Sequence, residues 1–218
     1  MMHEQGSPEW LKERLGKFTA SNIYKLMGIP RSKTETLTET AKTYILERVA
    51  EKLTGIPVQI DTAATEWGKD NEPLARKWYA KLTGNQVEET GFHDWGMNAG
   101  GSPDGLIIHA TGAPIGIIEI KCPFNTANHL RHLMIDSVQY FKENHPEYYY
   151  QIQMNLMATQ TGYADFISFD PRINEECGLF VFRVPRIEAD QLAIRDKIFA
   201  AIEYMEQVFN RVRKPALQ

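Results

Sequence analysis

The chain has 218 residues and a formal net charge of -4, so it can bury one substantial core and is not coated with basic residues. Its acidic excess lies in residues 61–160, which contain 12 acidic and 7 basic residues. Two cysteines, Cys122 and Cys177, exclude a disulfide framework and a four-thiolate iron-sulfur cluster. The sequence shows neither a signal-peptide pattern nor an apolar run of membrane-spanning length, so we expect a cytoplasmic protein without a membrane partner.

Capping residues and apolar spacing predict three helices near the N-terminus. Ser7, followed by proline, opens a helix over residues 7–16, and a short second helix is expected over residues 19–28. A capping box at Thr36 then opens a helix over residues 36–55. Its predicted apolar face consists of Leu37, Ala41, Tyr44, Ile45, Val49 and Leu53.

A longer helix is predicted over residues 62–82, and a strand is expected over residues 87–95. Pro73 lies inside this helix, where it removes one backbone hydrogen bond and bends the axis. Glu72 directly precedes the bend, and taken alone it is one of several acidic residues on a helix. The side chains predicted to face inward are Trp67, Leu74, Trp78 and Leu82.

The C-terminal half reads as further helices and strands. We expect helices over residues 126–135 and 147–161, strands over residues 164–169 and 179–184, and a long helix over residues 189–212. With the hairpin described below they predict an α+β fold, with a central mixed sheet of about five strands flanked by helices. The packing residues of the last helix are Leu192, Ile198, Ile202, Met205 and Phe209.

Two of these predicted helices carry pairs of polar side chains at helical spacing. His129 and His132 share one helix face, which makes a zinc pair conceivable, but no cysteine or third histidine accompanies them at metal-ligand spacing. A solvated or phosphate-facing helix is therefore the preferred interpretation. On the helix over residues 147–161, Gln151 and Asn155 lie together, away from the apolar stripe.

Residues 101–123 contain two short apolar runs joined by a Gly/Pro turn, which is typical of a β-hairpin. A strand alternates its faces, so Ile118 and Ile120 point into a core while Glu119 and Lys121 project together from the other side. The alternative is an ordinary exposed strand face with this glutamate and lysine in solvent.

Asp104 lies in the Ser-Pro-Asp-Gly turn that precedes the first strand of the hairpin, from which it can reach Glu119 on the neighbouring strand. Two carboxylates and the ammonium group of Lys121 then converge. Hard oxygen ligands at one point suit Mg²⁺ or Mn²⁺. The lysine can orient a water nucleophile or neutralise charge that develops on a phosphate.

Seven short motifs, in order along the chain, carry a family resemblance that extends from Trp10 to Arg172. The chain resembles the phage lambda exonuclease family, also called YqaJ-like viral recombinases, of the alkaline exonuclease type. The motifs are Trp10-x-x-x-Arg14-Leu15-Gly16, Thr19-Ala20-Ser21, Trp67-Gly68-x-x-x-Glu72, Ser102-Pro103-Asp104-Gly105, Glu119-Ile120-Lys121-Cys122-Pro123, Gln151-x-Gln153 and Asp170-Pro171-Arg172.

This resemblance implies a restriction-endonuclease-like PD-(D/E)xK core within a single domain over residues 1–218. The helices of residues 7–55 would contribute a 5′-phosphate pocket, residues 62–185 the catalytic core, and residues 189–212 a C-terminal helix. The implied activity is Mg²⁺-dependent 5′→3′ degradation of the 5′-ended strand of linear double-stranded DNA, with a pair of metal ions and with Mn²⁺ as a substitute.

The implied partners are double-stranded DNA ends and further copies of the chain in a ring-shaped homotrimer. A single-strand annealing protein of a phage recombination system would use the 3′ single strand, in the cytoplasm of a bacterial host. The implied metal ligands are Asp104, Glu119 and the backbone carbonyl of Ile120. Lys121 would act on the nucleophilic water. Glu72 and Gln151 would support the active site, and Glu72 could also hold a second ion directly or through a water.

The resemblance also assigns Arg14, Ser21 and Ser102 to the terminal 5′-phosphate. One position departs from the family pattern, because an arginine that follows the motif lysine by six residues is here Ala127. Arg131, one helical turn later, is expected to reach the same anion, or the pocket is weaker.

Two other functions remain open. An endonuclease with the same core would cut internally, as restriction or repair enzymes do, and would digest covalently closed circular DNA. A non-catalytic module that binds DNA ends would keep the core without hydrolysis, against which the intact aspartate, glutamate and lysine argue.

Overall fold

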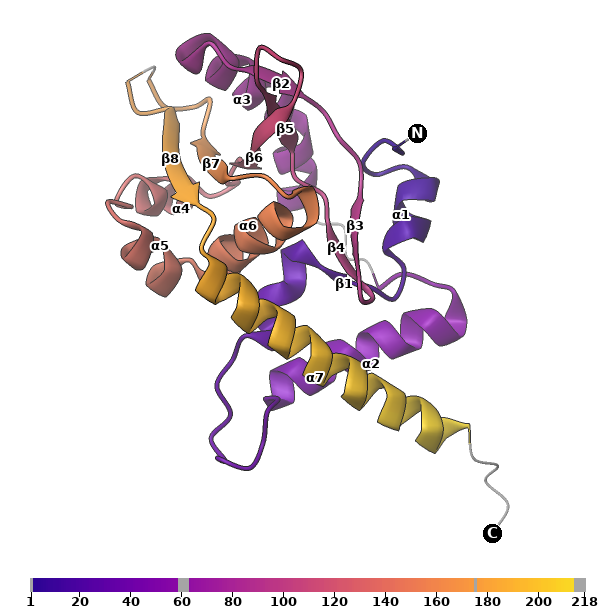
Figure 1. Cartoon of the computed structure of the whole chain (residues 1–218). Coiled ribbons are helices and arrows are strands. Elements are labelled where there is room, and N and C mark those ends of the chain that lie inside the picture. Colours follow the sequence, from indigo (N-terminus) through magenta and orange to yellow (C-terminus); the bar gives the residue numbers. More distant parts are fainter. Residues whose placement is uncertain (1, 59–62, 175, 214–218) are drawn as a thin grey trace.

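The computed structural model describes residues 2–58, 63–174 and 176–213 (Figure 1). The predicted helix start at Thr62 and the last residues of the predicted domain therefore lie outside the described residues. In the described part, the main sheet has five strands in the order β2-β5-β6-β7-β8, which confirms the predicted α+β fold with a mixed sheet. The strands are β2 (Gln86–Glu88), β5 (Gly105–Ile108), β6 (Pro114–Lys121), β7 (Tyr163–Phe169) and β8 (Leu179–Pro185).

The predicted hairpin is present and lies at the centre of this sheet. β5 pairs antiparallel with β6, and β6 pairs parallel with β7, so β6 has hydrogen-bonded neighbours on both sides. Ile118 is fully buried and Ile120 is 2% exposed, as the strand alternation predicts. Glu119, on the opposite face, is also fully buried, so it does not point into solvent.

A second sheet of three short strands, ordered β1-β4-β3, was not predicted. β1 (Phe18–Thr19), β4 (Ala99–Gly101) and β3 (His93–Gly96) form it. The single strand predicted over residues 87–95 is wrong, because its two halves, β2 and β3, belong to different sheets. The chain leaves the main sheet at Gly91 and Phe92, where the glycine packs tightly against the backbone of His3 and the phenylalanine is buried.

The N-terminal helices follow their capping signals. Ser7 accepts a hydrogen bond from the Trp10 backbone N–H and caps α1 (Pro8–Arg14), as predicted. The second element is a 3-10 helix, η1 (Ala20–Leu26). The cap of α2 (Glu39–Thr54) lies two residues after the predicted one, because Thr38, not Thr36, accepts from the Ala41 N–H at 3.1 Å.

α3 (Ala63–Thr83) is the predicted long helix, with Pro73 inside it. Its predicted inward face is partly wrong. Leu74 and Leu82 are 40% and 66% exposed, whereas Ala75 and Tyr79 are fully buried against the sheet. The sheet contacts a stripe one residue further along the helix than the leucines occupy, and these leucines remain on the solvent side.

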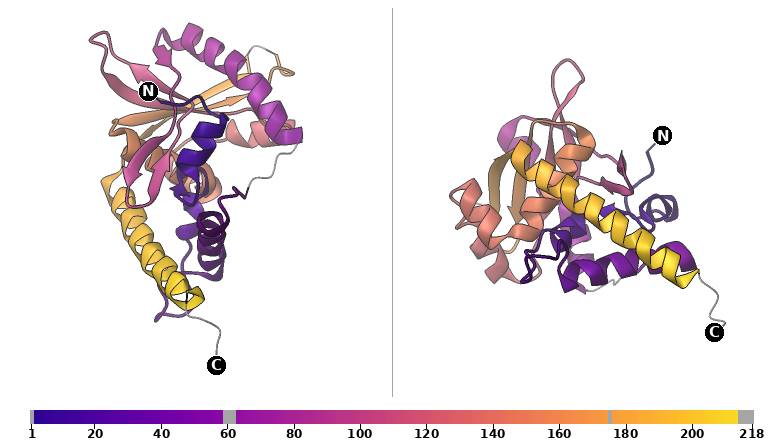
Figure 2. Two further views of the ribbon diagram at one scale, coloured as in Figure 1. Left: turned by 90° about the vertical axis from the view of Figure 1, so that its right-hand side faces the viewer. Right: turned by 60° about the horizontal axis from the view of Figure 1, so that its bottom comes forward.

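Four more helices complete the described chain: α4 (Thr126–His132), α5 (Val138–Asn144), α6 (Pro146–Thr159) and α7 (Glu188–Val212). α5 was not predicted, and α7 matches the predicted helix. Leu53 and Leu192, both predicted as packing residues, are 58% and 48% exposed. Figures 1 and 2 show the long α7 lying beside α2, and the two helices share one hydrophobic cluster with η1.

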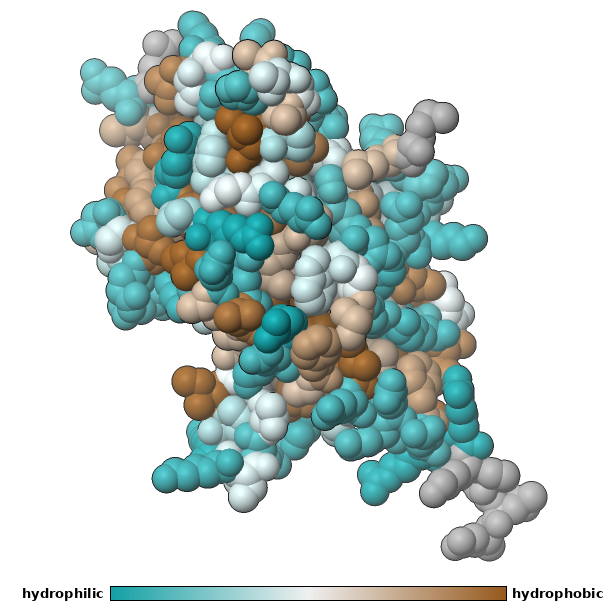
Figure 3. Space-filling view, in the orientation of Figure 1, coloured by the Kyte–Doolittle hydropathy of each residue, from teal (hydrophilic) through white to brown (hydrophobic). Residues whose placement is uncertain are grey.

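α6 is the central helix of the molecule. An unbroken run from Gln151 to Met157 is buried, so this helix has packing partners all round. Met154 belongs to the cluster with α2 and α7, and Ile152 to the cluster under the main sheet. In the orientation of Figure 1, hydrophobic residues on the surface form separate patches between polar side chains (Figure 3). None of the helices in the described ranges is long and apolar enough to cross a bilayer.

Candidate active site

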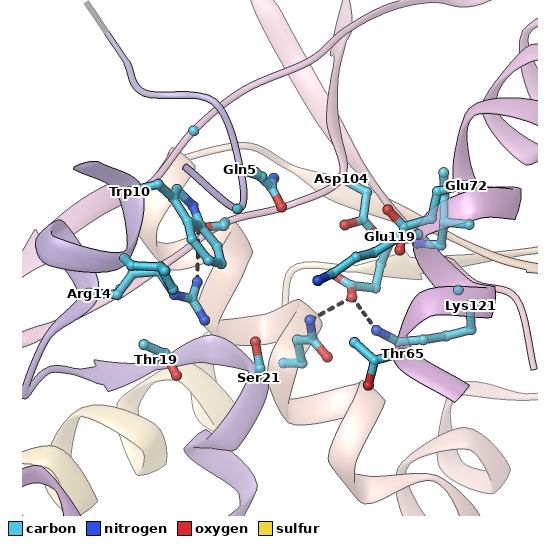
Figure 4. A pocket seen from close by; sticks show the side chains of 18 of the residues that line it. Gln5, Trp10, Arg14, Thr19, Ser21, Thr65, Glu72, Asp104, Glu119 and Lys121 are labelled. Atoms are coloured by element: carbon cyan, nitrogen blue, oxygen red, sulfur yellow. Dashed lines mark hydrogen bonds and ion pairs between the residues drawn. The ribbon is translucent and has the colours of Figure 1, made fainter. Parts of the chain in front are cut away.

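A cavity of about 1850 Å³ opens between the N-terminal helices and the central hairpin. Figure 4 shows Arg14 and Ser21 at one end of it and Asp104, Glu119 and Lys121 at the other. α1 and η1 supply the first group, and β6 and the turn before β5 supply the second. The folded chain therefore brings residues of six of the seven sequence motifs to a single cavity.

Glu119 is held in the cavity by three side-chain hydrogen bonds. Its Oε1 accepts hydrogen bonds from Lys121 Nζ at 2.7 Å and from Gln151 Nε2 at 2.5 Å. Its Oε2 accepts from Asn155 Nδ2 at 2.9 Å. Burial raises the pKa of Glu119 to about 8; the ammonium of Lys121 counters this rise, and the charge of Asp104 adds to it.

Asn155 is a site residue to which sequence reasoning gave no role. Its helix spacing placed it beside Gln151, which is the signal that could have assigned it, because two amides one turn apart can reach the same carboxylate. Asn155 is fully buried and packs so closely against Gly101 that a side chain there would collide with its Oδ1. It thus connects Glu119 with the small sheet, immediately before Ser102.

Asp104 is held by the hairpin, as predicted. Its backbone N–H donates to the Ile118 carbonyl at 3.1 Å, and its Oδ2 accepts from the Ile120 N–H at 2.6 Å. Arg76 Nη2 donates to the Asp104 carbonyl at 3.2 Å. Burial raises the pKa of Asp104 above its usual range, although Lys121 and the Ile120 N–H oppose the rise.

Glu72 reaches the same cavity from α3, one residue before Pro73. Burial, followed by the charge of Asp104, raises its pKa to about 7. Burial alone would lower the pKa of Lys121, but the carboxylates of Glu119 and Asp104 outweigh it and raise that pKa above its usual value. Lys121 is therefore an ammonium group at neutral pH, suited to donating hydrogen bonds and not to accepting a proton.

The other end of the cavity is lined by the residues that the resemblance assigns to a phosphate. Arg14 Nη1 donates to Ser102 Oγ at 3.1 Å, and Trp10 Nε1 donates to the same oxygen at 3.0 Å. The Arg14 guanidinium also stacks 4.0 Å from the centroid of the Trp10 ring. Burial lowers the pKa of Arg14 to about 10, which leaves it charged at neutral pH. Ser21 is exposed and lines the cavity.

The structure does not bring Arg131 into this cavity. Arg131 is exposed and donates to Asn128 Oδ1 at 2.7 Å. Asn128 lines the cavity, whereas Arg131 and Ala127 do not. The expectation that Arg131 replaces the missing arginine is therefore not supported, because helix α4 turns its side chain to the outer surface.

The preferred interpretation of His129 and His132 is wrong, because both are buried rather than solvated. The Nδ1 atoms of both rings lie within hydrogen-bond distance of Ser168 Oγ, at 2.8 and 2.7 Å. His129 Nε2 lies 2.7 Å from the Cys177 carbonyl, which can only accept, so this nitrogen carries the proton. In the neutral ring His129 Nδ1 then accepts from Ser168, and His132 Nδ1–H donates to it. This network is part of the core, and its geometry does not suggest a zinc site.

The carboxylates have the donor chemistry of a Mg²⁺ or Mn²⁺ site. Glu72, Asp104 and Glu119 line one cavity, and burial raises the pKa of each, so a divalent cation among them would stabilise their charged forms. Among the described residues, no three His, Cys, Asp or Glu side chains already converge as a complete metal site. The carboxylate oxygens of Glu72, Asp104 and Glu119 fit such an ion. Lys121 and Gln151 both donate to the same oxygen of Glu119, Oε1.

The model of the YqaJ-like viral recombinase domain matches residues 9–163, which are most of the chain and include every residue of the cavity's acidic end. The chain belongs to the YqaJ-like viral recombinase family. It is similar to the crystal structure of an alkaline exonuclease, LHK-Exo, from Laribacter hongkongensis, with 30% identity, a TM-score of 0.78, and coverage of 96% of this chain and 98% of that one.

The structure of LHK-Exo in complex with dAMP gives 31% identity and a TM-score of 0.79, with the same coverage. A phage-related exonuclease from Haemophilus somnus 129PT shares the fold, with 21% identity, a TM-score of 0.75, and coverage of 90% of this chain and 96% of that one. A comparison with curated proteins found no match. The family and the similarity to the LHK-Exo structures support a nuclease role for this chain.

Proposed function

We propose that this nuclease is a Mg²⁺-dependent exonuclease that degrades the 5′-ended strand of linear double-stranded DNA and leaves 3′ single-stranded DNA. The observation that carries the proposal is the cavity itself, which has Arg14 at one end, hydrogen-bonded to Ser102, and the Asp104, Glu119 and Lys121 cluster at the other. When the terminal phosphate of a DNA strand binds at the Arg14 end of the cavity, a nearby phosphodiester of the same strand lies at the end that holds the carboxylates. Such an enzyme begins at an end of the duplex.

The metal ligands would be Asp104, Glu119 and the Ile120 carbonyl, with Glu72 able to hold a second ion. Bound Mg²⁺ would polarise the scissile phosphate and offset the charge that develops on it. Mn²⁺, which takes the same oxygen ligands, is expected to substitute.

The protein's own residues position the reacting groups. Lys121 donates hydrogen bonds from its ammonium group and can hold the attacking water or the phosphate oxygens. Gln151 and Asn155 fix both oxygens of Glu119, so this carboxylate presents one orientation to the cavity. Trp10 and Arg14 hold the hydroxyl of Ser102, which leaves remaining N–H groups of the guanidinium for an anion.

The test is digestion of one DNA in two forms, linear and covalently closed circular, with Mg²⁺ and with strand-specific labels on the linear form. We expect loss of the 5′-ended strand of the linear DNA and survival of the circle. Asp104→Asn, which keeps the size of the side chain, is expected to reduce the rate by at least about 100-fold. Digestion of the circle would favour an endonuclease, and intact linear DNA with Mg²⁺ and Mn²⁺ would favour a DNA-end-binding module.

We also propose that the enzyme acts as a ring-shaped homotrimer, beside a single-strand annealing protein of a phage recombination system that uses its 3′ single-stranded product. Family membership supports this context. With a chain mass of 25.0 kDa, the trimer would have a mass of about 75 kDa, three times that of the chain, and light scattering after size exclusion measures it directly. A mass of one chain at micromolar concentration would reject the trimer.

A further inference from the structure

An aromatic side chain stands at the rim of the cavity, close to the catalytic lysine. Phe124 lines the cavity, yet it is 54% exposed. It follows Lys121 by three residues, so the Cα atoms of the two are within about 10 Å of each other. That distance corresponds to about three nucleotides along a DNA strand.

Phe124 packs against a second aromatic side chain. Its ring and the ring of Trp67 form a T-shaped pair, with centroids 6.0 Å apart and an interplanar angle of 82°. The guanidinium of Arg172 lies 4.5 Å from the centroid of the Trp67 ring. Three side chains, from α3, from the loop after β6 and from the loop after β7, therefore contact one another in one group.

The backbone on both sides of Phe124 is also fixed. Arg172 Nη2 donates to the Pro123 carbonyl at 3.1 Å, and Thr126 Oγ1 donates to Asp170 Oδ2 at 2.8 Å. The carboxylate of Asp170 is fully buried and accepts from Arg172 Nε and Nη2, both at 2.8 Å. One buried carboxylate thus anchors Pro123, directly before Phe124, and Thr126, two residues after it, by a chain of hydrogen bonds.

An exposed aromatic ring alone does not indicate a ligand, but this ring packs against Trp67, has hydrogen-bonded residues on both sides in sequence, and borders the cavity that holds the carboxylates. A ring that is already ordered loses little conformational entropy when a flat ligand stacks on it. Asn125 and Asn128, which follow Phe124 in sequence, line the same cavity with their amide groups. A nucleobase is the flat group that a DNA strand would present here, and aromatic side chains stack on bases of any sequence.

We propose that Phe124 is a stacking platform for a nucleobase in the first three nucleotides of the degraded strand. This site would contact a base, in addition to the proposed contacts with phosphate. The inference rests on the proposed exonuclease function. Its role is to hold the strand in register while the phosphodiester lies at Lys121. Loss of the platform weakens substrate binding and does not remove a group that performs the reaction.

The experiment combines two changes, one in the protein and one in the DNA. Linear duplexes with a 5′-phosphate carry a single abasic nucleotide at position 1, 2 or 3 of the degraded strand. Wild type, Phe124→Ala and Phe124→Trp are compared by initial rates in Mg²⁺ and by duplex binding in EDTA. We expect the alanine variant to lose about tenfold in affinity for the normal duplex, with the loss appearing in KM more than in kcat.

The decisive measurement is the coupling between the two changes. At one of the three positions, the abasic nucleotide should weaken binding to wild type by about tenfold and leave binding to Phe124→Ala unchanged. Phe124→Trp should keep the sensitivity. Leu130→Ala is the matched control, because Leu130 is 51% exposed and does not line the cavity, and it should behave as wild type.

The outcomes separate this inference from the proposed function. If wild type binds duplexes in EDTA with the expected coupling but digests nothing with Mg²⁺, the stacking site stands and the exonuclease proposal fails. If wild type digests DNA but Phe124→Ala responds to every abasic nucleotide as wild type does, the stacking site is rejected. Equal losses for the Phe124 and Leu130 variants would also reject it.

Discussion

At the scale of single residues, Asn155 and Gln153 of α6 are both buried amides, and only Asn155 contacts the active site. Asn155 donates to Glu119, whereas Gln153 donates to the Pro185 carbonyl and accepts from the Ile187 N–H. A hydrogen bond to a charged group contributes about 1.5–3 kcal/mol. We therefore expect Asn155→Leu to lower kcat by roughly 10- to 100-fold.

Gln153→Met is the matched control for this prediction. It should lower the melting temperature, because two backbone groups lose their buried partner, and leave kcat close to that of wild type. Rates and thermal unfolding of both variants check the prediction. An Asn155→Leu enzyme with a wild-type rate would show that Gln151 and Lys121 suffice to hold Glu119.

His132 gives the molecule a pH dependence of stability. Burial, and then the neighbouring rings of His145 and His129, lower its pKa to about 3. The unfolded chain binds a proton near pH 6.5, so between these values the unfolded state holds more protons and stability falls as pH falls. This one group should remove about 2 kcal/mol between pH 7 and pH 5. Stability above pH 7 is unaffected by it.

Chemical denaturation at pH 7 and pH 5 measures this loss, and His132→Gln isolates it. The glutamine variant should be less stable at pH 7, because it loses the bond to Ser168, but it should depend less on pH. Parallel pH profiles for the two proteins would contradict the prediction.

At the scale of secondary structure, local signals predicted the helices and the central hairpin well. Ser7 caps α1, α7 matches its apolar repeat, and Ile118 and Ile120 are buried as alternation requires. The small sheet escaped prediction because β4 is Ala-Gly-Gly, which carries no alternation of apolar side chains. Its pairing is set by tertiary contacts, such as the tight packing of Gly101 against Asn155.

The same limit applies to the site. Asp104, Glu119 and Lys121 were placed from strand alternation and one turn, which are local. The burial of His129 and the outward direction of Arg131 depend on how α4 packs against β7, and helical spacing alone does not determine which face of a helix is buried.

Arg172 connects three elements, and its removal should affect stability more than that of an ordinary surface arginine. Its partner Asp170 is fully buried, and hydrogen bonds from Arg172 outweigh burial and lower the pKa of that carboxyl to about 2. The arginine side chain itself is 41% exposed, so solvent weakens the pair. We expect Arg172→Met to cost about 1–2 kcal/mol in the free energy of unfolding.

Arg195→Met is the control, because Arg195 is 43% exposed but pairs with Asp196, which is 67% exposed. That variant should change stability by less than about 0.5 kcal/mol. Urea denaturation compares the two. Equal effects would mean that the Asp170 anchor contributes no more than a surface ion pair.

At the scale of the whole molecule, the proposed Mg²⁺ site would link metal binding to folding. Glu72, Asp104 and Glu119 come from α3, from the turn before β5 and from β6, and unfolding separates them. Mg²⁺ should therefore bind the folded chain and stabilise it by about 2.7 kcal/mol at 100 times its dissociation constant. For a chain of this size, that is a rise in melting temperature of roughly 5 to 10 °C.

Asp104→Asn separates this effect from general effects of salt. The asparagine can still accept the Ile120 N–H, so the variant should fold, but it lacks one charged ligand and should show a much smaller Mg²⁺-dependent shift. Thermal unfolding with Mg²⁺, and with NaCl at equal ionic strength, measures the difference. The shift arises because the folded chain concentrates buried carboxylates whose charged forms are costly without a cation. Equal shifts in wild type and Asp104→Asn would mean that Mg²⁺ binds elsewhere, and the metal assignment of this cavity would then be wrong.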